Sequence, residues 1–139
     1  MVISLLLIPI TIIIILLYYL LWNAYIEYSN EKNKLIQRIK SDLYLIYPND
    51  TTASIRIYAG DASYTFNKNK IYLCLYDQNG KEYPYQTLIN VAIHELAHVL
   101  CDEYGHTEKF WEINNDLQRK AIETGIIFSS VPRNYCQLF

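Results

Sequence analysis

Two histidines and a glutamate stand at a spacing that could bind a metal ion and use it. His94 and His98 are four positions apart, and Glu95 follows the first of them. On a helix this spacing places both imidazoles on one face, about one turn apart, so both can reach a single cation. In such a pattern the glutamate is not a ligand: it takes a proton from the zinc-bound water and passes it to the leaving amine. The segment therefore predicts a zinc site for peptide-bond hydrolysis, with Glu95 as general base.

The alternative is a pair of ordinary surface histidines. The chain has 3 histidines, and all lie between positions 94 and 106. Their surroundings are largely apolar: Val91, Ala92, Ile93, Leu96, Ala97, Val99 and Leu100. Polar side chains on a mostly buried helix need polar partners or a metal, which favours the metal site.

A catalytic zinc ion takes three protein ligands and keeps one position open. His106 is the preferred third ligand, because Gly105 before it allows a tight turn that returns the imidazole towards the helix. The alternatives are acidic residues of the loop or the next helix: Glu103, Glu108, Glu112 and Glu123. The spacing differs from the longer metzincin pattern, so this is not a metzincin by sequence.

Two helices are expected to carry these residues. The first begins near Tyr85 and ends near Cys101, with apolar residues recurring at a period of 3.6. Thr107 is the expected N-cap of the second, which ends at Gly125. The inner stripe of the second helix is Phe110, Ile113, Leu117 and Ala121.

Short strands precede these helices. Alternation predicts strands over 54–59, 64–66 and 71–76, with the polar run 67–70 between the last two and a turn at Asn79-Gly80. Strands followed by helices indicate an α+β domain with a short mixed sheet.

The N-terminus is an almost unbroken apolar run over residues 2–22, about the length that a helix needs to cross a bilayer. A core helix would show a polar face, and this run has none. A signal peptide is the other alternative, but no basic region precedes the run and no small-residue cleavage site follows it. We expect a single-pass transmembrane helix over residues 1–22.

A helical stalk is expected over residues 23–47, continuing out of the membrane, before a domain over 48–139. Its apolar stripe, which is expected to pack on the domain, is Leu35, Ile36, Ile39, Leu43 and Ile46. Basic residues cluster just after the span: Lys32, Lys34, Arg38 and Lys40. Because positive charge stays on the cytoplasmic side, the domain is expected to face the cytoplasm.

The cysteines and the net charge bear on two further properties, disulfide bonding and nucleic-acid binding. The 3 cysteines are odd in number and widely spaced, so no disulfide framework is expected. Cys74 and Cys101 are expected to pack in the core, and Cys136 could approach the site. The formal net charge of -2 gives no reason to expect nucleic-acid binding.

The stretch from His94 to His98, followed by Gly105-His106 and the aromatic pair Phe110-Trp111, resembles the WLM and SprT-like metalloproteases. The strand around 67–75, the Asn79-Gly80 turn and the late Tyr135-Cys136 look most like WLM domains carried by large DNA viruses. The resemblance covers roughly residues 50–139.

It implies a small zincin-like domain with zinc ligands His94, His98 and His106 and the catalytic base Glu95. It also implies that the strand over 71–76 lies near the cleft, where an extended peptide pairs with a sheet edge.

The first hypothesis is a membrane-anchored zinc metallopeptidase that acts on a protein or peptide substrate. A non-catalytic, zinc-stabilised binding module tethered to a membrane is the second, although structural zinc normally has four protein ligands. A protease for DNA–protein crosslinks, as among the family it resembles, is the third. Tyr104 and Tyr135 are both candidates for stabilising the oxyanion.

Overall fold

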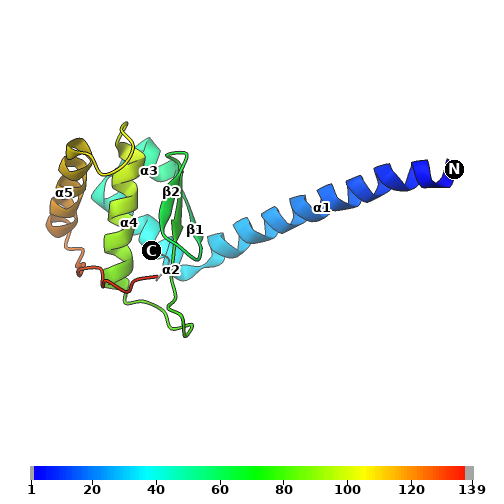
Figure 1. Ribbon diagram of the computed structural model, residues 1–139. Helices are drawn as coiled ribbons and strands as arrows, with labels where there is room; N and C mark the ends of the chain where they lie inside the picture. The colour runs from blue at the N-terminus through cyan, green and yellow to red at the C-terminus, as the bar shows by residue number, and fades with distance from the viewer. Residues whose placement is uncertain (1, 137–139) are drawn as a thin grey trace. The chain divides into compact units, whose positions relative to one another are not determined.

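The computed structural model describes residues 2–136, and side chains from Leu7 onwards. The chain is α+β, with five helices and three strands among these residues (Figure 1). It divides after Asn33 into two units, which are described separately.

The first unit is the helix α1, Val2–Lys32. Its segment Leu7–Lys32 is 26 residues long and apolar enough to cross a membrane, and none of its most apolar window is buried. Signal sequences and the core helices of soluble proteins can have the same length and composition. Aromatic side chains gather towards its C-terminal half, at Tyr18, Tyr19, Trp22, Tyr25 and Tyr28.

The helix expected over 23–47 is divided at Asn33. The helix α2, Lys34–Ile46, starts there and buries four apolar side chains of the predicted stripe: Ile36, Ile39, Leu43 and Ile46. They belong to the same hydrophobic core as α4 and the sheet. The expected packing of this stripe on the domain is confirmed, and residues 34–47 belong to the domain itself rather than to a separate stalk.

The strand expected from residue 54 begins later, because a short helix comes first. The helix α3, Asp50–Ser54, is capped by Asn49, whose side chain accepts a hydrogen bond from the Thr52 backbone N–H at 2.8 Å. The strand β1, Arg56–Ala59, then follows with Ile57 and Tyr58 buried.

The sheet is mixed and three-stranded, in the order β1-β3-β2. The strand β2, Tyr64–Phe66, runs antiparallel to β3, Lys70–Leu73, and β1 runs parallel to β3. The strand expected over 71–76 thus stops at Leu73 and lies in the middle of the sheet. Its central position in the sheet results from pairing with β1 on one side and β2 on the other, which local sequence patterns do not reveal.

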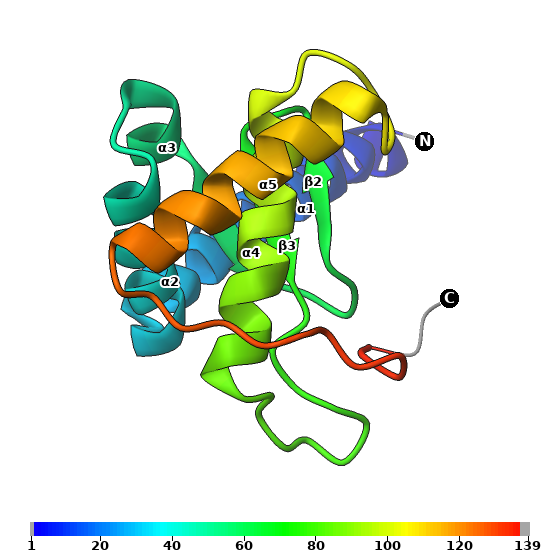
Figure 2. The same cartoon turned by 90° about the vertical axis from the view of Figure 1, so that its left-hand side faces the viewer.

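Two long helices complete the domain. The helix α4, Tyr85–Leu100, and the helix α5, Glu108–Glu123, begin and end within a residue or two of their predicted bounds. Thr107 caps α5, and Gly125 ends it with φ +79°, a conformation that favours glycine. Figure 2 shows α5 lying across α4.

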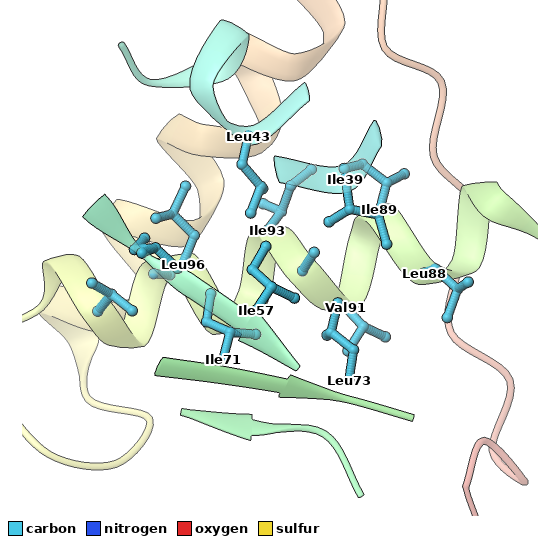
Figure 3. Close-up of a cluster of buried hydrophobic side chains, with 14 of the residues drawn as sticks. Ile39, Leu43, Ile57, Ile71, Leu73, Leu88, Ile89, Val91, Ile93 and Leu96 are labelled. Atoms are coloured by element: carbon cyan, nitrogen blue, oxygen red, sulfur yellow. The ribbon is translucent and has the colours of Figure 1, made fainter. Parts of the chain in front are cut away.

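The core forms around α4. In Figure 3, Ile89, Ile93 and Leu96 of α4 lie between Ile39 and Leu43 of α2 and the side chains of the sheet. Ile93, Leu96 and Ile71 are completely shielded from solvent. The helix that carries the histidine pair is thereby held firmly on several sides.

Candidate metal centre

Three imidazoles converge beside the C-terminal half of α4. The Nε2 atom of His106 lies 3.0 Å from Nε2 of His94 and 3.2 Å from Nε2 of His98. Their possible ligand atoms all lie within 4.8 Å of one another. Tetrahedral zinc with Zn–N bonds of about 2.0–2.1 Å separates ligand nitrogens by about 3.3 Å. The donor set and its spacing therefore fit a zinc ion.

The pKa values of His94 and His98 are lowered in a way that suits metal binding. Burial lowers the pKa of His94 to about 4, helped by the neighbouring His98 and His106. Burial likewise lowers the pKa of His98, together with the charges of His106 and Lys68. Because only a neutral imidazole has a lone pair free for a metal, these shifts keep the ligand form present at neutral pH.

Aromatic residues of α5 hold the rings in place. Phe110, which is fully buried, stacks on His98 at 4.3 Å between ring centroids and meets His94 edge-on at 4.9 Å. Trp111 stacks on His106 at 5.6 Å. The Phe-Trp pair on which the resemblance rested thus packs against all three imidazoles.

The acidic alternatives lie elsewhere. Among residues 2–136, the group close enough to share a metal consists of the three histidines. Glu103, Glu108 and Glu112 instead line a separate open depression together with Lys109. The structure thus places His106, and not these glutamates, beside the histidine pair.

His106→Ala should therefore weaken zinc binding by more than the roughly 10- to 100-fold that loss of a residue supporting a metal ligand causes. Competition against a fluorescent zinc chelator, with the full chain in detergent, measures this. Glu112→Ala is the matched control and should bind zinc like the wild type. An equal loss in both variants would argue against His106 as a ligand.

Glu95 is buried, with 6 % of its surface exposed. Thr65 Oγ1, on β2, lies 2.7 Å from Glu95 Oε2 and 2.9 Å from the Glu95 backbone O, so the hydroxyl can donate to either. Burial raises the pKa of the Glu95 carboxyl to about 7, against the opposing effect of the Thr65 hydrogen bond. No feature of the sequence singled out Thr65, because its contact with Glu95 spans 30 residues.

A cleft of about 400 Å³ opens beside these groups. Residues 63–65 and 67–68 line one side, and the three histidines, Glu95, Tyr104 and Gly105 line the rest. The expected role of the strand over 71–76 at this edge is wrong: β2 is the edge strand that borders the cleft, and β3 is central.

The C-terminal segment overturns the expectation about the cysteines. Cys74 and Cys136 form a disulfide across 62 residues of sequence, so neither is simply a packed thiol. The odd number of cysteines gave no indication of this pair. The number is odd because the third cysteine, Cys101, is buried and free, as expected.

The two tyrosines considered for the oxyanion differ in position. The hydroxyl of Tyr135 donates to the Cys74 backbone O at 2.8 Å and lies 2.8 Å from Ser63 Oγ. It therefore fastens the tail and does not line the cleft. Tyr104 lines the cleft and is 87 % exposed.

Comparison with known proteins finds viral relatives. Uncharacterized protein 136R of Invertebrate iridescent virus 6 is 43% identical over 89 residues, which cover 60% of this chain and 50% of that protein. Uncharacterized protein 042R of Invertebrate iridescent virus 3 is 43% identical over 88 residues, covering 61% and 55%. Uncharacterized protein R325 of Acanthamoeba polyphaga mimivirus is 31% identical over 122 residues, covering 84% and 58%.

This chain thus spans between 50% and 58% of the length of these relatives. No protein-family model matches it, and no solved structure matches it.

Proposed function

We propose that this chain is a zinc metallopeptidase of the zincin class, similar to WLM and SprT-like proteins and held at a membrane by α1. The convergence of three imidazoles beside a buried glutamate carries the proposal. A structural zinc site normally has four protein ligands, often cysteines. Two of the three cysteines are joined to each other instead, at Cys74 and Cys136.

A bound zinc ion would supply a Lewis acid that polarises the scissile carbonyl and lowers the pKa of a water molecule. His94, His98 and His106 would hold it. Glu95 then accepts a proton from the attacking water and delivers it to the leaving amine. Thr65 engages Glu95 Oε2, which leaves Oε1 for the proton. A carboxyl pKa of about 7 suits this exchange, since such a group both accepts and releases protons near neutrality.

The substrate is a protein or peptide in extended form. The edge strand β2 borders the cleft, and an extended chain binds such an edge through backbone hydrogen bonds.

The helix α1 is the proposed membrane anchor. The aromatic residues Tyr18 to Tyr28 suit the membrane–water interface at which such side chains concentrate. The basic residues that follow, including Lys32 and Lys34, favour a domain on the cytoplasmic side. The Cys74–Cys136 disulfide favours an oxidising environment instead, so the state of this bond in cells tests the orientation.

The proposal is tested with the full chain in detergent. Metal analysis should find one zinc ion per chain, and mass spectrometry of a mixture of unfolded peptides should find cleavage that stops on chelation and returns with zinc. Bound zinc without any cleavage would favour the tethered binding module. Cleavage that requires DNA, with a steep salt dependence, would favour the crosslink protease.

A further inference from the structure

The loop that carries the third histidine has little apolar packing of its own. Residues 102–106 are all exposed, between buried Cys101 and the N-cap Thr107. Gly105 turns the loop with φ +81°. Phe110 and Trp111 contact the imidazole of His106, but no side chain of residues 102–105 is buried, so polar contacts must hold the backbone of the loop that leads to it.

A lysine from the sheet makes such contacts. Lys68, in the turn between β2 and β3, donates from Nζ to the backbone O atoms of His98 at 2.9 Å, Cys101 at 2.6 Å and Glu103 at 2.9 Å. An ammonium group has three protons, and all three are used. The last carbonyls of a helix lack partners within it and attract positive charge. Lys68 therefore ties the end of α4 to the start of the loop.

The backbone of this turn gives no reason for a lysine. Asn67 and Lys68 have φ +49° and +56°, the left-handed conformation of tight hairpin turns, where Asn-Gly is the favoured pair. A residue with a Cβ atom is strained in this conformation, whereas glycine is not. Glycine at position 68 would satisfy the turn better, so the lysine is explained by what its side chain holds.

We infer that Lys68 is a positioning residue of the metal centre: it holds the loop so that His106 reaches His94 and His98. This inference rests on the metal site of the proposed function. The charge of Lys68 by itself acts in the opposite direction, because an ammonium group near a cation repels it. Removing the lysine thus tightens zinc binding if only its charge matters, and weakens it if its hydrogen bonds matter.

The test is Lys68→Gly in the full chain, with zinc affinity measured by chelator competition. Glycine suits the turn, so the hairpin is kept. We expect affinity to fall by about tenfold or more, as for other residues that support metal ligands. In a His106→Ala background the same change should cause no loss, since the ligand that Lys68 positions is already gone. Lys109→Met is the control: it removes the exposed ion pair between Lys109 of α5 and Asp102 of the loop and should have little effect.

Unchanged or tighter zinc binding in Lys68→Gly would overturn the inference, and so would an equal loss with and without His106. A second measurement separates it from the proposed function. In the metal-free protein, Lys68→Gly should lower the backbone ¹⁵N order parameters of residues 102–106 to below about 0.6, the flexible range. If the wild type binds no zinc, the proposed function fails, and unchanged order parameters would then reject the role of Lys68 as well.

Discussion

Glu95→Gln is expected to slow peptide cleavage by about 10²- to 10⁴-fold while the chain still binds one zinc ion. The range is the usual contribution of a general acid or base. Glutamine has nearly the same shape but cannot take up the proton of the attacking water. Zinc should remain, because Glu95 is outside the group of three histidines. Thr65 can still donate to the amide oxygen, so the helix and the strand keep their contact.

The measurement combines metal analysis with cleavage rates on the same preparation. Glu112→Gln is a suitable control, because Glu112 is exposed on α5 and lies outside the cleft. It should cleave at the wild-type rate. Full activity in Glu95→Gln would show that the assigned base is wrong, whereas loss of zinc in this variant would point to a structural role for the glutamate.

Replacing both Cys74 and Cys136 by alanine is expected to lower the free energy of unfolding of the domain by about 4 kcal/mol. The bond closes a loop across 62 residues, and a cross-link of this span removes about that much chain entropy from the unfolded state. The tail would also lose its covalent hold beside Tyr83, whose hydroxyl accepts a hydrogen bond from the Cys136 backbone N–H. Urea unfolding followed by tryptophan fluorescence and circular dichroism measures the change.

Reduction of the wild type supplies the matched comparison. A reductant should shift the wild-type midpoint to that of the double variant and should leave the variant unchanged. Alkylation of the denatured, unreduced chain should label one thiol, which is Cys101. Labelling of all three cysteines would show that the bond does not form.

The same labelling in intact cells reports on orientation. A cytoplasmic domain would be kept reduced by the thiol systems of that compartment, so the paired cysteines would be labelled. A bond found intact in cells would contradict the orientation expected from the basic residues after the span, and would place the domain in an oxidising environment.

Local rules predicted the helices around the site well. The period of α4, the Thr107 cap and the Gly125 stop each depend on neighbours within one or two turns, and the structure has them where expected. The spacing of His94 and His98 is likewise a local property of a helix. Even the third histidine was within reach of the sequence, because Gly105 marks the turn that returns His106 to the helix.

Tertiary structure decided how α2 and the strands are arranged around the helix that carries His94 and His98. The helix expected over 23–47 is divided at Asn33, and α2 belongs to the domain whose core Ile39 and Leu43 help to form. The order of the strands, which makes β2 the edge of the cleft, depends on pairing that alternation does not reveal.

The contacts that hold the residues of the candidate site are equally non-local. Thr65 reaches Glu95 across 30 residues, Lys68 reaches Glu103 across 35, and Cys74 joins Cys136 across 62. The sequence by itself thus determined the helix of the candidate metal site and the spacing of His94 and His98, since these follow from the geometry of one helix. The fold alone decided which side chains position them, because such contacts form only when distant segments pack together.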